Sequence, residues 1–148
     1  MKTSIRTLLI AALVIGLLPL ASVTYAPHAL AASDADCSIW LCLPSGFPSG
    51  CGDAKRAFKN RLKKFKPPLP NFTSCLLKDS PQTSSMNAHE GVAAKMPGGH
   101  FIDGEPCLKF QNNGDIVRWT PRGCLSTWHF IDTYLDGEKY GERYYYQR

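Results

Sequence analysis

The sequence predicts a small α+β domain that is stabilised by disulfides. All six cysteines follow residue 31, a placement that suits the cross-linking of an exported chain. Apolar residues recur at helical spacing between residues 54 and 65, whereas residues 100–148 carry strand-forming residues and glycine-containing turns. Because the helical pattern precedes the strand pattern, we expect a helical N-terminal half and a small antiparallel C-terminal sheet of hairpins.

The first 31 residues have the pattern of a secretory signal peptide. Two basic residues precede a 13-residue apolar run at residues 8–20, and no acidic residue is present. Small residues at Ala29 and Ala31 fit the site of signal peptidase, so we expect cleavage after Ala31, with Ala32 as the alternative. The apolar run is shorter than the ~20 residues that a membrane-spanning helix needs, which argues against an uncleaved anchor.

Residues 32–148 are expected to form a single mature domain. A chain of this length is too short for a nucleotide-binding fold with a separate substrate domain. Its core is thin, and small exported domains commonly add covalent cross-links. Removal of the leader with its two basic residues leaves 15 basic and 12 acidic residues, a net charge of +3. For an exported chain of such mild charge we expect no nucleic-acid partner.

The first part of the mature chain, residues 34–77, is expected to be helical. Residues 35–43 predict a short buried helix with acids at its start, where the helix dipole favours negative charge. A loop rich in glycine and proline follows at residues 44–50. Asp53 is then expected to cap an amphipathic helix of about a dozen residues. The core-facing positions of this helix are expected to be Ala54, Ala57, Phe58, Leu62 and Phe65.

The rest of the chain divides into a linker-like segment and a strand-rich part. Residues 78–99 are rich in small and polar residues without a sustained period, and we expect a linker with one helical turn at residues 90–95. Residues 107–119 predict a hairpin around a glycine-containing turn. Residues 131–146 predict a second hairpin, so we expect residues 100–148 to form the sheet.

The six cysteines allow fifteen pairings, among which sequence alone does not choose. Their grouping along the chain favours Cys37–Cys75, Cys42–Cys51 and Cys107–Cys124. The last pair brackets the first hairpin, and the first two lie within the helical part. No Cys-x-x-Cys motif is present, so structural disulfides are favoured over a thioredoxin-like site or a zinc knuckle.

The candidate catalytic groups match no known constellation. The histidines are His28, His89, His100 and His129. His89 is followed by a glutamate as in a zinc-protease helix, but Ala93 occupies the place of the second histidine. No Gly-x-Ser-x-Gly motif offers a serine nucleophile, and Glu90, Asp103 and Glu105 show no pattern of an opposed pair. We therefore expect no catalytic residue, no cofactor and no metal.

Basic residues are concentrated at positions 55–66, where seven of twelve residues are lysine or arginine. Lys59, Lys63 and Lys66 lie at intervals of four and three, so they form one stripe if the segment is helical. Two interpretations remain open. The stripe is either a solvated face whose lysine stems cover apolar surface, or a contact for an acidic protein partner or an anionic membrane surface.

The chain ends in a run of tyrosines, Tyr144, Tyr145 and Tyr146. In a strand, Tyr145 points to the opposite face from its two neighbours. Tyrosine is enriched at protein interfaces, so a terminal strand that exposes tyrosines on one face is a candidate docking edge. The alternative is that one face packs on the sheet and the other is merely tolerated.

One block of the chain carries a family pattern. Cys37 and Cys42 form a Cys-x4-Cys-Leu start, a loop with glycine and proline follows, Cys51 opens the basic helix, and Cys75 lies beside a short apolar segment. In these features the block, residues 34–77, resembles the TrbM/KikA-type conjugal transfer proteins. The resemblance implies a periplasmic accessory of plasmid conjugation that works with a type IV secretion or mating-pair apparatus. It brings no catalytic residues.

Together these observations predict a non-enzymatic, disulfide-linked periplasmic protein, exported by a cleaved signal peptide. The expected partners are envelope proteins of a conjugation or type IV secretion apparatus, and an anionic membrane surface is the second candidate. Two other functions remain open. One is a small secreted cell-wall hydrolase, and the other is a secreted cationic effector that acts on membranes.

Overall fold

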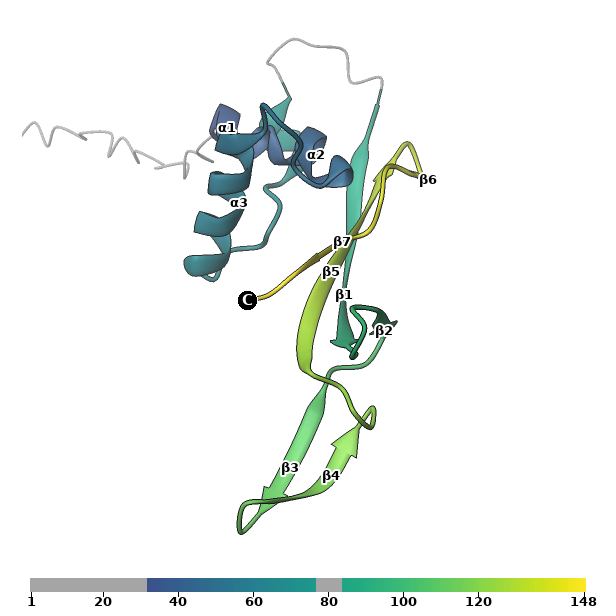
Figure 1. The fold of residues 1–148 in the computed structure, drawn as a ribbon. Helices are drawn as coiled ribbons and strands as arrows, with labels where there is room; N and C mark the ends of the chain where they lie inside the picture. Colours follow the sequence, from purple (N-terminus) through teal and green to yellow (C-terminus); the bar gives the residue numbers. More distant parts are fainter. Residues whose placement is uncertain (1–31, 77–83) are drawn as a thin grey trace, which may run out of the picture.

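Figure 1 shows the computed structural model of the chain, which describes residues 32–76 and 84–148. The helical elements are α1 Asp34–Cys37, α2 Ile39–Cys42, η1 Leu43–Ser45, α3 Gly52–Lys63 and η2 Phe72–Cys75, where η denotes a 3-10 helix. The strands are β1 Met86–Lys95, β2 Phe101–Asp103, β3 Leu108–Asn112, β4 Asp115–Thr120, β5 Ser126–Leu135, β6 Glu138–Lys139 and β7 Tyr144–Tyr146. The predicted small α+β domain is confirmed in part, since helices and antiparallel strands are both present and most of the structure is sheet. Only α3 is longer than four residues, so the N-terminal half is helical in part.

The main sheet is built around the pair β1 and β5. All ten residues of β1 pair antiparallel with β5, from Met86 opposite Leu135 to Lys95 opposite Ser126. Strand β2 extends the sheet beyond β1, and β6 and β7 pair one after the other along the free side of β5. The predicted hairpin at residues 131–146 is therefore present as β5 with β6 and β7.

The expected linker contains β1, which with β5 is one of the two longest strands of the described residues. Residues 86–95, expected to be linker with a helical turn, form β1 instead. Alanine, glycine, glutamate and lysine are weak strand formers, so this strand depends on its ladder with β5 more than on local preference. Residues 78–83 of the expected linker, and residues 1–31 of the expected signal peptide, lie outside the described ranges.

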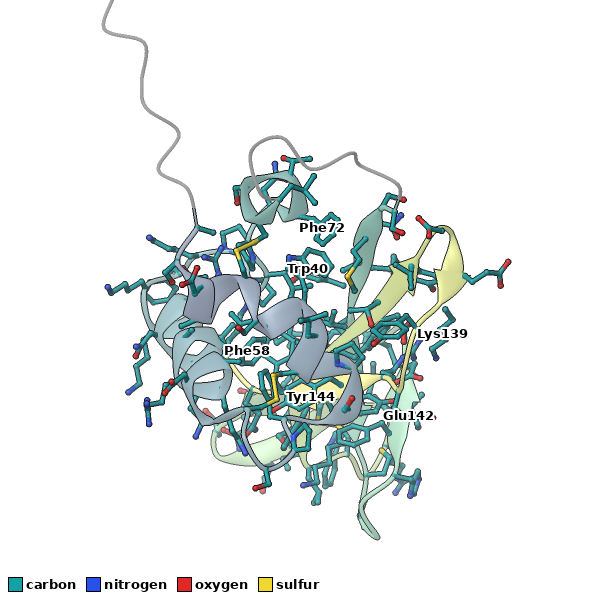
Figure 2. The ribbon with its side chains drawn as sticks, turned by 90° about the horizontal axis from the view of Figure 1, so that it is seen from above. Trp40, Phe58, Phe72, Lys139, Glu142 and Tyr144 are labelled. Carbon is teal, nitrogen blue, oxygen red and sulfur yellow. A yellow bond between two sulfur atoms is a disulfide. The ribbon has the colours of Figure 1, made fainter. Side chains whose placement is uncertain are left out.

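The helices cover one face of the main sheet (Figures 1 and 2). Phe58 of α3 lies against the strand residues Tyr144 and Tyr146, with ring centroids 5.6 Å and 5.3 Å away. Figure 2 places Phe58 and Tyr144 in the layer between α3 and the sheet. The buried core contains Ile39, Trp40, Leu43, Phe47, Ala54, Phe58, Leu69, Met86, Ile131 and Tyr146. The start of α3 differs from expectation, since Cys51 precedes it and Asp53 lies within its first turn.

Three disulfides join the pairs that the cysteine grouping favours. They are Cys37–Cys75, Cys42–Cys51 and Cys107–Cys124, with Cα–Cα separations of 5.4, 5.9 and 5.7 Å. Such cross-links are typical of proteins that mature outside the reducing cytosol. None of the helices within residues 32–76 and 84–148 combines the length and apolarity required to cross a bilayer.

Strands β3 and β4 form a separate two-stranded ribbon that extends away from the main sheet (Figure 1). The ribbon corresponds to the predicted hairpin at residues 107–119. An isolated hairpin is marginally stable in water. Here the Cys107–Cys124 disulfide closes its base, and the Cys107 amide donates to Thr127 Oγ1 of β5 at 2.9 Å. We call residues 107–125 the arm.

Candidate functional site

The predicted lysine stripe is exposed, but it is only partly helical. Lys59 and Lys63 lie on α3, whereas Lys66 lies beyond the end of the helix. Among the ion pairs of the described residues, none involves these three lysines. Their charges therefore remain available to an anionic partner.

The helix ends before Phe65, which corrects the expectation that this residue faces the core. Phe65 is 96% exposed and has a positive φ of 53°. Its amide donates to Leu62 O and the Lys66 amide donates to Arg61 O, both at 3.0 Å, a pattern that closes a helix C-terminus. The turn therefore points the Phe65 ring away from the apolar side of α3.

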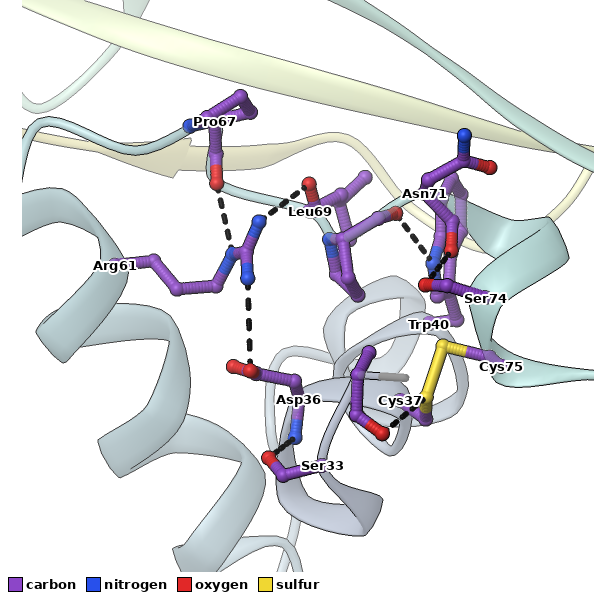
Figure 3. A network of polar contacts seen from close by, with 12 residues as sticks. Ser33, Asp36, Cys37, Trp40, Arg61, Pro67, Leu69, Asn71, Ser74 and Cys75 are labelled. Atoms are coloured by element: carbon purple, nitrogen blue, oxygen red, sulfur yellow. Dashed lines mark hydrogen bonds and ion pairs between the residues drawn. A yellow bond between two sulfur atoms is a disulfide. The ribbon is translucent and has the colours of Figure 1, made fainter. Parts of the chain in front are cut away.

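Arg61 belongs to the structural framework and not to the free basic surface (Figure 3). Its Nε donates to Pro67 O at 2.8 Å and its Nη2 donates to Leu69 O at 3.1 Å. Its Nη1 lies 3.6 Å from Asp36 Oδ2 of α1. A single guanidinium thus fastens α1 and the segment after α3 to the helix, so it contributes little to an external contact.

A shallow polar groove of about 390 Å³ lies between α1 and α3. Its lining includes Ser33, Asp36, Arg56, Asn60, Arg61 and Lys64. Arg56 pairs with Asp53, and Arg61 pairs with Asp36. Because internal partners satisfy most of its charge, the groove is a polar seam between the helices.

The tyrosine run does not form an exposed docking edge as a whole. Tyr146 is buried, and burial together with the nearby Glu90 carboxylate raises the pKa of Tyr146 to about 12. Tyr144 packs edge-on against Phe47 and Phe58, and burial raises the pKa of Tyr144 as well. The alternation predicted from sequence is present, but the face of Tyr144 and Tyr146 is the one that the helices cover. Tyr146 is buried and Tyr144 is half-buried, so little of either ring is exposed to a partner.

Tyr145 lies on the other face of the sheet, within a polar and aromatic cluster. Its ring stacks on Phe101 with centroids 3.9 Å apart, and its hydroxyl donates to Asp103 Oδ1 at 2.9 Å. Arg143 bridges Asp103 and Asp132, and its guanidinium lies 3.8 Å from the centre of the Phe130 ring. The members of this cluster satisfy one another, so the cluster stabilises the uncovered face of the sheet.

The candidate catalytic groups are divided between the two faces of the sheet. Residues paired across an antiparallel ladder share a face. His89 lies opposite Asp132, on the uncovered face, whereas His129 lies on the helix-covered face beside Tyr146. Burial and the charge of Arg148 lower the pKa of His129. The sheet therefore separates the two imidazoles.

The acids are separated in the same way. Glu90 lies opposite Ile131 on the helix-covered face, whereas Asp103 lies opposite Ala93 on the uncovered face. The two carboxylates therefore do not face each other across a cleft. In the part of the chain that the structure describes, no three histidine, cysteine, aspartate or glutamate side chains gather as metal ligands.

The arm is the surface that the sequence did not reveal. Four large apolar side chains of the arm are 42–52% exposed, namely Leu108, Phe110, Ile116 and Leu125. Cation–π pairs link its strands, with Lys109 Nζ 4.9 Å from the Trp119 ring centre and Arg118 Cζ 5.7 Å from that of Phe110. The turn chemistry predicts the hairpin, but only the structure shows that it projects from the main sheet.

Comparisons with known proteins do not assign these surfaces. No protein-family model, curated protein or solved structure matches the chain. The exposed arm and the unpaired lysines around the end of α3 are therefore distinguished by their own geometry and charge.

Proposed function

We propose that the protein is a periplasmic accessory of plasmid conjugation that acts through protein contacts and catalyses no reaction. The observation that carries the proposal is the arm, which projects from a disulfide-linked body and exposes apolar side chains. Contiguous exposed apolar surface marks interaction sites. Leu108 and Phe110 lie two residues apart on β3, so they share one face of the arm. A hairpin that served only the fold would gain more by packing these side chains on the main sheet.

The chemistry of the arm favours a protein partner with acidic residues around an apolar surface. The arm carries three basic residues, Lys109, Arg118 and Arg122, against a single acid, Asp115. Charge of one sign disfavours self-association through the arm and attracts an oppositely charged surface. Both strands of the ribbon also have an unpaired edge, to which an extended partner segment can add.

The cysteine block supports the conjugative setting of the proposal. The resemblance to TrbM/KikA-type proteins depends on the spacing of four cysteines, and these four cysteines form two disulfides. One disulfide ties α1 to η2, and the other ties α2 to the residue that precedes α3. The spacing thus has a physical role in an exported protein, in agreement with the periplasmic location that the leader predicts.

Photo-crosslinking in donor cells tests the proposal. A photoreactive group in place of Phe110 is expected to give an adduct with a component of the mating-pair apparatus, identified by mass spectrometry. The same group in place of Leu41, an exposed residue of α2, is the matched control. The proposal is wrong if the arm captures no apparatus component, or if both positions capture the same proteins.

A further inference from the structure

Phe65 occupies a position at which the fold favours glycine. It is the first residue beyond the cap of α3, where the left-handed conformation closes the helix. Glycine adopts this conformation without steric cost, whereas a bulky residue does not. A phenylalanine at this position therefore needs a compensating contact.

A second phenylalanine of the chain shows what such compensation looks like. Phe47 also has a positive φ, of 57°, but only 7% of it is exposed. Its ring packs against Phe58 and Tyr144, with centroids 5.5 Å and 5.2 Å away. Phe65 has a similar positive φ and is 96% exposed, so no ring within residues 32–76 and 84–148 packs on it in this way. The ring is therefore open to a partner outside the chain.

The residues around Phe65 indicate the charge of that partner. Lys63, Lys64 and Lys66 lie within two residues of Phe65 in the chain, and all three are exposed. No ion pair of the described residues involves any of them. An exposed aromatic ring close in the chain to several exposed lysines is complementary to an anionic surface with an apolar interior.

We propose that Phe65 and its flanking lysines form a membrane-docking tip that binds the anionic headgroup surface of a phospholipid bilayer. The ring enters the boundary between headgroups and acyl chains, and the ammonium groups remain among the phosphates. The size of the tip favours a bilayer over an acidic protein. The apolar part of the tip is a single phenylalanine, which buries at most about 250 Å², whereas a stable protein interface takes about 800 Å² from each partner.

Vesicle sedimentation of the disulfide-linked protein, purified from the periplasm, tests this proposal without any conjugation component. We expect binding to vesicles of equal parts phosphatidylcholine and phosphatidylglycerol, weak binding to phosphatidylcholine alone, and release at high salt. Phe65→Gly is expected to weaken binding about tenfold, since the ring supplies the apolar contact. Because glycine suits the left-handed turn, its melting temperature should equal or exceed that of the wild type.

Four further variants complete the design. Lys63→Gln combined with Lys64→Gln is expected to weaken binding to the anionic vesicles and to reduce its salt dependence. Arg56→Gln is the matched control, because it removes a positive charge that is already paired with Asp53, and it should leave binding nearly unchanged. Phe65→Trp should retain binding, and brominated acyl chains should quench the fluorescence of the tryptophan introduced at this position. Leu41→Ala controls for the loss of an exposed apolar residue elsewhere.

Either of two results would overturn the membrane proposal. The first is that the wild type and Phe65→Gly do not differ in their binding to the anionic vesicles, whether both bind equally or neither binds. The second is a photoreactive group in place of Phe65 that captures protein and no lipid in cell envelopes, which would assign the tip to an acidic protein. Both results leave the arm and its crosslinking test unaffected, so the two proposals fail separately.

Discussion

Arg143 holds the buried carboxylate of Asp132 with two donors. Its Nε donates to Asp132 Oδ1 at 3.0 Å, and its Nη2 pairs with Oδ2. Asp132 is 3% exposed, and a second cation, Lys139 Nζ, lies 3.4 Å from Asp132 Oδ1. The hydrogen bonds from Arg143, opposed in part by burial, hold the pKa of Asp132 below its usual value. The pair joins β5 to the segment before β7.

This pair predicts a specific dependence of stability on pH. A carboxylate whose folded pKa is depressed stabilises the fold above its unfolded pKa, near 4, and the contribution is lost as pH falls through the folded pKa. Asp132→Asn should therefore lower the free energy of unfolding by about 1–3 kcal/mol near neutral pH. The difference in the free energy of unfolding between Asp132→Asn and the wild type should become smaller below about pH 4. Urea unfolding across this pH range measures both.

Asp103 provides the matched control for Asp132. It pairs with the same arginine, but its side chain is 40% exposed. Asp103→Asn should therefore cost less than about 1 kcal/mol at any pH. Equal losses for the two variants would show that burial does not distinguish the two carboxylates.

Gly91 and Phe130 predict a second effect on stability. The two residues are paired across β1 and β5, and a Cβ at position 91 would lie 2.2 Å from Phe130 Cζ. Gly91→Ala should therefore lower the free energy of unfolding by about 1–3 kcal/mol through overpacking. Gly52→Ala, where a Cβ has nothing within 4 Å, should be neutral. Near-native stability of Gly91→Ala would contradict the close approach of the Phe130 ring.

The Cys42–Cys51 disulfide predicts an effect on protein level. It closes a loop beside the buried core, and loss of a native disulfide in a small domain costs about 2–5 kcal/mol. Cys42→Ser with Cys51→Ser should therefore reduce the amount of protein in the periplasm, measured by immunoblot.

Cys107→Ser with Cys124→Ser should instead speed amide hydrogen exchange in the arm, while the amides of α3 stay protected. Equal exchange in both regions would argue against a separate arm.

The local chemistry of the chain predicts much of this fold. Both hairpins follow from strand-forming residues around glycine-containing turns. The three disulfides are the pairs that the grouping of the cysteines favours, although sequence alone does not choose among the fifteen pairings. Alternation also predicts that Tyr145 faces away from Tyr144 and Tyr146. Which face is buried could not be predicted in the same way, because it depends on where the helices pack.

Two elements were mispredicted for identifiable physical reasons. Strand β1 contains residues of weak strand preference, and its partner β5 lies far along the chain, so no local pattern reveals it. Phe65 continues the helical spacing of Leu62, but α3 ends at Lys63. Pro67 and Pro68 predict that the helix stops before them, because the residue before a proline disfavours the helical conformation. The left-handed turn at Phe65 ends the helix earlier. The position that closes α3 holds phenylalanine instead of the usual glycine, so the sequence does not show where the helix ends.

The central claim, an accessory of conjugation that acts through contacts, is tested most directly by transfer frequency from donors that lack the gene. We expect transfer to fall and to be restored by the wild type. His89→Gln, His100→Gln and His129→Gln combined should also restore it, whereas Phe110→Ser with Ile116→Ser should not, at equal periplasmic levels. Normal transfer without the gene would contradict the claim, as would a stable histidine variant that fails to restore transfer.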